Sequence, residues 1–162
     1  MATVEERLSE LGITLPTPAA PAAAYVPTVI TGKQLFISGQ LPLGLDPLPT
    51  GQLTEIDHVD GDIAEGSTLH RAQIAARQCG INLIAQAKAA TGDLETIARV
   101  VKLVGFVNSA SGFRQQHLVV NGASQLMAAA FAEKGEHARS AVGVAALPFG
   151  VIVEVEAIFE LV

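Results

Sequence analysis

Apolar residues recur at helical spacing in two long segments of the chain. The first runs from Asp62 to about Ala90, where one stripe recurs every three or four positions: Leu69, Ala72, Ala76, Cys79, Leu83 and Ala87. This spacing predicts a helix with one buried face, which Thr91-Gly92-Asp93 ends. A second helix is predicted from Gly112 to about Ala132, and a short one from Val4 to Leu11.

Runs of β-branched residues between turn signals predict five strands. These runs are residues 25–31, 35–38, 97–107, 140–147 and 151–161. The turn at 31–34 predicts a hairpin, and Pro148-Phe149-Gly150 predicts a second hairpin that closes the chain. Strands, then helix–strand–helix, then a hairpin predict an α+β fold in which two helices pack on one face of the sheet.

The last predicted hairpin brings candidate chemistry together. If its loop is two residues long, Gly143 pairs with Glu154, and Arg139 and Ala141 lie on the same face. A cation, a carboxylate and small side chains between them favour a cleft for a small carboxylate ligand, because the arginine fork binds a carboxylate through two parallel hydrogen bonds. The alternative is that Arg139 and Glu154 pair with other charges at the sheet rim, and a one-residue change in the loop would reverse the register.

Length and composition limit the classes of protein. The 162 residues suit a single domain over 1–162, and with 49% hydrophobic but only 16% charged residues we expect part of the apolar surface to form a subunit interface. The net charge of −6 argues against a nucleic-acid partner. The acidic start MATVEERLSEL does not look like a signal peptide, and glutamates interrupt the apolar C-terminal segment. We therefore expect a cytoplasmic protein with no membrane segment.

Other catalytic motifs are missing from the sequence. It contains no phosphate loop, nucleophile elbow, HExxH or dinucleotide-binding glycine motif, so we expect no cofactor. The histidines are too scattered to predict a metal site: His58, His70, His117 and His137. The single cysteine, Cys79, excludes an internal disulfide and lies on the apolar stripe, which predicts a core position.

Three segments, taken in order, resemble a known family. Residues 137–161, HARSAVGVAALPFGVIVEVEAIFEL, are similar to the C-terminal signature of the RidA/YjgF family of reactive-intermediate deaminases, also labelled L-PSP endoribonucleases. Residues 25–42, YVPTVITGKQLFISGQLP, resemble its N-terminal tyrosine, strand and Ser-Gly-Gln-x-Pro element. Val120-Asn121-Gly122 is a weaker match to the asparagine early in the second helix.

The resemblance implies a fold like that of Bacillus-type chorismate mutase, with a mixed sheet, in a homotrimer with ligand clefts between subunits. It also implies hydrolysis of enamine/imine acids, formed by pyridoxal-phosphate dehydratases, to 2-ketoacids and ammonia. Arg139 would hold the substrate carboxylate and Glu154 would position or activate the water. The other residues implied to line the cleft are Tyr25, Ser38, Gly39, Asn121 and Ala141. Because an imine is already electrophilic, orientation plus a positioned water suit the modest acceleration required.

Departures from the family pattern indicate a divergent subgroup. Ala141 stands where the family often has cysteine, the stretch from Asn121 to Arg139 is slightly longer, and so are the loop and helix of residues 43–90. A second interpretation is a non-catalytic binder of small carboxylic metabolites, which needs Arg139 but not Glu154. For Tyr25, an amphipathic residue that caps a strand at an interface is as good an interpretation as a ligand contact. The acidic charge and the 4% aromatic content disfavour the endoribonuclease label.

Overall fold

Five strands form one mixed sheet in the computed structural model, which describes residues 2–162. They are β1 (Thr28–Thr31), β2 (Gln34–Gln40), β3 (Ile97–Asn108), β4 (Ala138–Val144) and β5 (Val153–Leu161). Their order across the sheet is β1-β2-β5-β3-β4, so β1 and β4 are the edge strands. β3 and β4 run parallel, and the other neighbouring pairs are antiparallel.

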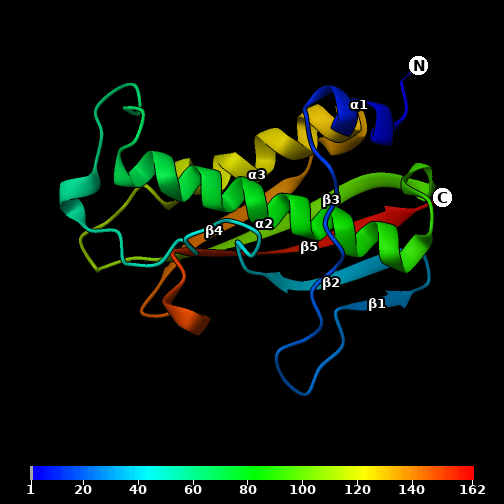
Figure 1. Cartoon of the computed structure of the whole chain (residues 1–162), viewed down its shortest axis with the longest axis horizontal. Helices are drawn as coiled ribbons and strands as arrows, with labels where there is room; N and C mark the ends of the chain where they lie inside the picture. Colours follow the sequence, from blue (N-terminus) through cyan, green and yellow to red (C-terminus); the bar gives the residue numbers. More distant parts are fainter. Residues whose placement is uncertain (1) are drawn as a thin grey trace.

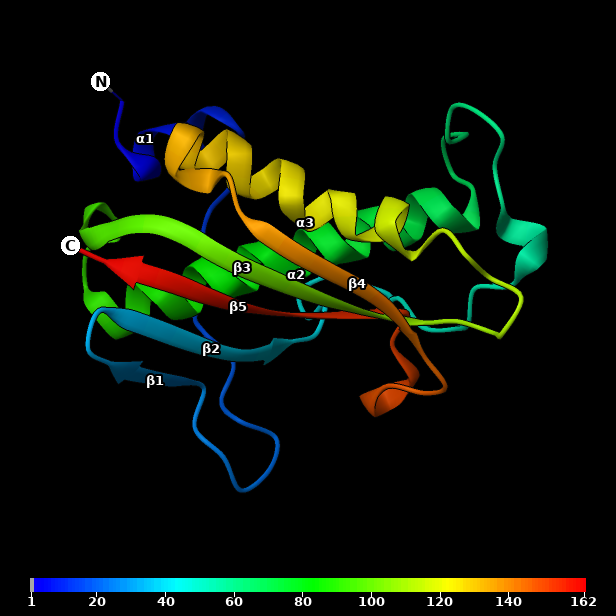
Figure 2. The same cartoon turned by 180° about the vertical axis from the view of Figure 1, so that it is seen from behind.

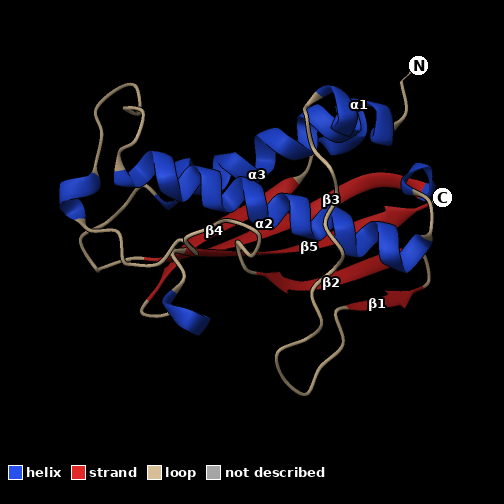
Figure 3. Cartoon of the chain, in the orientation of Figure 1, coloured by secondary structure: helices blue, strands red, loops and turns tan. Residues whose placement is uncertain are grey.

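Two helices cover one face of this sheet, α2 (Thr68–Thr91) and α3 (Gln116–Phe131). They lie in front of the strands in Figure 1 and behind them in Figure 2, and Figure 3 separates the helix and strand layers by colour. A short helix, α1 (Val4–Glu10), packs on α3. None of the described helices is long and apolar enough to cross a membrane. The predicted α+β arrangement with two helices on one face is confirmed.

The core lies between the helices and the sheet. Alternate residues of β5 point toward the helices and are buried: Val153, Val155, Ala157 and Phe159. The predicted apolar stripe of α2 is buried along its whole length, Cys79 included. The two helices approach closely at Gly122, where an added Cβ would collide with the backbone carbonyl of Gln73. Each large apolar side chain buried in this layer contributes about 1.5–3 kcal/mol.

Both long helices begin later than the sequence pattern predicts. α2 begins at Thr68 rather than Asp62, because Gly66 adopts a left-handed φ of 75° and the Ser67 side chain caps the helix by accepting the His70 backbone N–H. α3 begins at Gln116 rather than Gly112. Periodicity alone does not distinguish a first helical turn from the loop before it.

The predicted C-terminal hairpin is wrong. The chain does turn after β4, where the Gly150 N–H donates to the Leu147 carbonyl at 3.0 Å, but the two flanking strands do not pair with each other. β4 instead pairs in parallel with β3, and β5 lies on the other side of β3, between β3 and β2. A turn signal shows that the chain reverses, whereas the crossover through α3 decides which strands become neighbours.

Candidate functional site

Arg139 lies on the edge strand β4 and faces α3. It pairs with Leu103, which pairs with Ala157 on the helix-covered face. Its Nη1 donates to Asn121 Oδ1 at 2.8 Å and to Ser124 Oγ at 3.1 Å. Its Nη2 donates to the His117 carbonyl oxygen at 3.2 Å. All three acceptors belong to α3, so this helix sets the orientation of the guanidinium.

The hydrogen bonds to α3 leave one edge of the Arg139 guanidinium available. Nη1 uses both of its protons and Nη2 uses one, while Nε–H and the second Nη2 proton have no partner among residues 2–162. Nε and Nη2 form one edge of the planar group, the geometry that binds a carboxylate through two parallel bonds. Partial burial lowers the pKa of Arg139, yet an arginine in a protein keeps its proton at any ordinary pH.

Small residues continue the Arg139 face along β4. Ala141 pairs with Gly105 and Gly143 with Val107, so both positions face the helix layer, as Arg139 does. A Cβ added at Gly143 would lie 2.5 Å from Ser109 Oγ, so this part of β4 packs tightly beneath the start of α3. The structure therefore brings together Arg139, Asn121 and Ala141 from the predicted set.

Glu154 lies on the opposite face of the sheet from Arg139. It pairs with Phe106, which pairs with Val142, and Val142 alternates with the residues that face α3. The prediction that Arg139, Ala141, Gly143 and Glu154 share one face is therefore wrong. The error follows directly from the wrong hairpin, because pairing through β3 places Glu154 level with Val142 rather than with Gly143.

The Glu154 carboxyl packs against Gly39 of β2. An added Cβ at Gly39 would collide with this carboxyl, so glycine is what leaves room for it. A β-bulge between Ile37 and Gln40 shifts the β2 register at this point. Burial raises the pKa of Glu154, and the negative charge of Glu156 acts in the same direction. Glu154 has no hydrogen bond or ion pair within the described chain, so its carboxyl is available for proton transfer.

Tyr25 and Ser38 lie on the Gly39 side of the molecule. Ser38 Oγ donates to the Val26 carbonyl at 2.8 Å, which ties the bulge to the segment before β1. Tyr25 is 48% exposed and lines, with Gly39 and Phe149, a small hollow of about 60 Å³. The predicted residues thus fall into two half-sites: Arg139, Asn121 and Ala141 form one, and Glu154, Gly39, Ser38 and Tyr25 form the other.

Sequence reasoning missed two groups that hold Arg139. One is the Ser124 hydroxyl, which lies one helical turn after Asn121 and therefore on the same side of α3. The i, i+3 spacing from Asn121 could have pointed to it once α3 was known to pack against β4. The other is the backbone carbonyl of His117, for which a sequence carries no signal.

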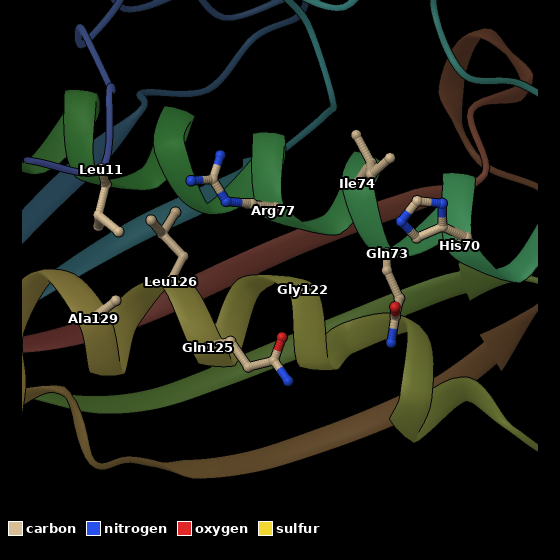
Figure 4. A pocket seen from close by; sticks show the side chains of 9 residues that line it. All are labelled: Leu11, His70, Gln73, Ile74, Arg77, Gly122, Gln125, Leu126 and Ala129. Atoms are coloured by element: carbon tan, nitrogen blue, oxygen red, sulfur yellow. The ribbon is translucent and has the colours of Figure 1, made fainter. Parts of the chain in front are cut away.

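Larger hollows in the described residues lie elsewhere. Figure 4 shows one of about 320 Å³ in the groove between α2 and α3. Its lining is Leu11, His70, Gln73, Ile74, Arg77, Gly122, Gln125, Leu126 and Ala129. Another, of about 410 Å³, lies between the loop of residues 45–50 and α2. Neither hollow is lined by a predicted site residue, so in a single chain the two half-sites do not coincide with the larger hollows.

The chain matches known proteins over nearly its whole length. A family model described as YjgF/chorismate_mutase-like, putative endoribonuclease, matches residues 5–161. The chain belongs to the YjgF/RidA family. This confirms the resemblance that the Arg-Ser and Ser-Gly-Gln segments indicated.

Three proteins illustrate the similarity. Protein TCP17 of Trypanosoma cruzi is 48% identical over 160 residues, covering 98% of this chain and 94% of that protein. The structure of Atu1372 from Agrobacterium tumefaciens, a protein of unknown function, is 47% identical with a TM-score of 0.81, covering 98% and 92% of the two chains. A protein from Shewanella oneidensis that carries the endoribonuclease description is 32% identical with a TM-score of 0.87, covering 99% and 100%. The chorismate-mutase-like α+β fold is thus shared over nearly the whole length of the chains.

Proposed function

We propose that the protein hydrolyses reactive enamine/imine acids to 2-ketoacids and ammonia in clefts between the subunits of a homotrimer. The observation that carries this proposal is the Arg139 guanidinium. Three acceptors on α3 fix it, and its Nε–Nη2 edge keeps two donors for a ligand carboxylate. Membership of the YjgF/RidA family supports the reaction type.

The need for a second subunit follows from the two faces of the sheet. Within one chain, the sheet separates Glu154 from Arg139, so one ligand can contact both only if the two residues come from different copies. The uncovered face that carries Glu154 also exposes apolar side chains, with Val29 at 51%, Phe36 at 38% and Val142 at 44%. A second copy that covers this face would bury them, which agrees with the low charged fraction of the sequence.

The proposed reaction begins when Arg139 of one subunit binds the substrate carboxylate, with Asn121 and Ala141 beside it. Glu154 of another subunit, in its ionised form, accepts a proton from water as the water oxygen bonds to the imine carbon. Glu154 then gives that proton to the nitrogen, which completes a carbinolamine. The carboxylate next takes the hydroxyl proton and passes it to the nitrogen as the carbon–oxygen double bond forms and the carbon–nitrogen bond breaks, so that ammonia and a 2-ketoacid are released. An enamine enters this sequence as its imine tautomer. Tyr25, Ser38 and Gly39 would line the side of the cleft that holds Glu154.

Alanine at position 141 is compatible with this chemistry. A cysteine thiol is not required to hold the carboxylate, because the arginine edge supplies both donors. Ala141 leaves more space beside Arg139 than cysteine would, so the substitution bears on which imines fit.

An assay with trapped imines tests the proposal. An amino-acid oxidase generates the imine, semicarbazide traps it, and the protein is expected to lower the amount of trapped product. Arg139→Lys keeps the charge but loses the fork, and should lose about tenfold to a hundredfold in activity for each charge-assisted hydrogen bond removed. If the wild-type protein leaves the trapped product unchanged across several small apolar amino acids, deamination is excluded. Light scattering should give the mass of a trimer, and a monomer mass would remove the shared cleft.

A second candidate function is binding of small carboxylic metabolites without turnover. It is favoured by the fact that the Arg139 edge is complete within a single chain and does not depend on Glu154. Glu154→Gln separates the two functions, since binding of a 2-ketoacid should survive in both cases, whereas turnover falls only if Glu154 is catalytic.

A further inference from the structure

His137 uses both ring nitrogens in hydrogen bonds next to the Arg139 half-site. Its Nδ1 lies 2.6 Å from the Gly135 carbonyl oxygen, and its Nε2 lies 2.9 Å from Ser124 Oγ. A carbonyl oxygen only accepts, so Nδ1 carries the proton. In the neutral ring Nε2 is then an acceptor, and the Ser124 hydroxyl donates to it.

This tautomer gives the hydrogen bonds one direction. Ser124 spends its single proton on His137, so its oxygen can face Arg139 only as an acceptor, and Nη1 donates to it at 3.1 Å. The chain of bonds thus runs from the guanidinium through the Ser124 hydroxyl and the imidazole to the Gly135 carbonyl. Each group in this chain of bonds acts as the donor or acceptor that its neighbour requires, and hydrogen bonds linked in this way strengthen one another.

The far end of this chain is held rigidly. Gly135 ends η3 (Ala132–Gly135), the short helical turn that follows α3. A Cβ added at Gly135 would collide with the carbonyl of Met127, so the turn packs directly on the backbone of α3. The Gly135 carbonyl therefore has a fixed position, and it fixes the imidazole ring in turn.

We propose that Ser124 and His137 are positioning residues that orient the Arg139 guanidinium for the ligand carboxylate. The inference rests on the proposed carboxylate-binding role of Arg139. Asn121 and the His117 carbonyl hold two other protons of the group, and Ser124 supplies the third point of attachment. Three points define the plane of the guanidinium, whereas two leave it able to tilt, and tilting misaligns the Nε–Nη2 edge. Neither residue contacts the ligand in this proposal.

Calorimetric binding of 2-oxobutanoate, a ketoacid of the product class, tests the role of each group. Ser124→Ala removes the acceptor for Arg139, and His137→Leu removes the group that orients the hydroxyl. Both should weaken binding by about twofold to tenfold, since Asn121 and His117 still hold Arg139. His137→Gln keeps an acceptor near the Nε2 position and should restore most of the affinity.

The matched control is Gln125→Ala. Gln125 neighbours Ser124 on α3, but it is exposed, lines the groove between α2 and α3 (Figure 4) and makes no hydrogen bond with Arg139 or His137. The Gln125→Ala variant should bind 2-oxobutanoate with the same affinity as the wild type. Equal affinity of wild type, Ser124→Ala and His137→Leu would overturn the proposal, as would failure of His137→Gln to bind more tightly than His137→Leu.

A second readout needs no ligand and separates this inference from the proposed function. In protein labelled with ¹⁵N-arginine, the Nε–H signal of Arg139 is assigned as the one lost in Arg139→Lys. Ser124→Ala and His137→Leu should shift and broaden it, while Gln125→Ala should not. If the wild type fails to bind any ketoacid but the signal responds as expected, the proposed function is wrong and the positioning chain stands. An unchanged signal in both variants overturns the chain whatever the protein binds.

Discussion

Substitution of Gly39 by alanine tests whether the place of the Glu154 carboxyl matters for turnover. An alanine Cβ would overlap the Glu154 carboxyl, and the contact falls on the far end of a flexible side chain rather than on backbone. Gly39 does not adopt a left-handed φ, so alanine fits its backbone. The carboxyl should therefore move aside while the fold persists, with a loss of stability of about 1 kcal/mol or less.

The expected effect on catalysis is much larger than the effect on stability. A catalytic group displaced by about 1 Å can lose on the order of a hundredfold in rate. Glu154 must move by roughly that distance to escape a Cβ, because the overlap is a full van der Waals clash rather than a tight contact. We therefore expect Gly39→Ala to lower kcat by about a hundredfold and to leave binding of a 2-ketoacid at Arg139 nearly unchanged.

The assay is imine removal in the semicarbazide competition, alongside calorimetry with 2-oxobutanoate and urea unfolding. Gly61→Ala is the matched control, because it also adds one methyl group to a glycine without a left-handed φ, but this glycine lies in a loop and the added methyl group meets nothing within 4 Å. A folded Gly39→Ala protein that keeps kcat within about threefold of wild type would refute the reasoning, since the position of Glu154 would then not limit the rate.

Three further predictions concern stability and reactivity. The pKa of Glu154 is raised in the folded state, so above the ordinary glutamate pKa of about 4.3 the folded protein binds more protons than the unfolded chain and its stability falls as pH rises. Glu154→Gln should therefore unfold at a higher urea concentration than wild type at pH 7, but not at pH 4. Phe149 has a left-handed φ of 56°, which strains any residue except glycine, and its side chain is 69% exposed. Phe149→Gly should therefore raise the free energy of unfolding by about 1 kcal/mol in the same urea titration, and a decrease would contradict this argument. Burial, and next the charge of Glu154, raise the pKa of the Cys79 thiol, so iodoacetamide at pH 8 should label the unfolded chain but not the native one.

The sequence pattern was most informative where burial repeats at a regular interval. The apolar stripe of α2 and the alternation of β5 identified core residues correctly, because each side chain in them reports the same buried face. Element ends were less visible. The start of α2 depends on the Ser67 cap and on the backbone of Gly66, and neither leaves a periodic signal.

Strand pairing was beyond the reach of local pattern. The turn at Pro148 and Phe149 has the composition of a hairpin, and the chain does reverse there. Pairing is decided by long-range packing, since α3 crosses over to place β4 beside β3 and leaves the other side of β3 to β5. One wrong neighbour moved Glu154 to the wrong face, because side chains alternate along every strand.

The two half-sites explain why Arg139 and Glu154 lie on opposite faces of the sheet although both suit the proposed reaction. The predicted hairpin placed Arg139 and Glu154 on one face because it paired the last two strands with each other. A sheet covered on one face by helices cannot present one cleft to both of its faces, so two residues on opposite faces cooperate only across an interface. The uncovered apolar face that carries Glu154, and the edge strand that carries Arg139, are the surfaces that such an interface would join. In the proposed function, assembly and catalysis are therefore linked, because Arg139 gains a catalytic partner only when a second copy supplies it.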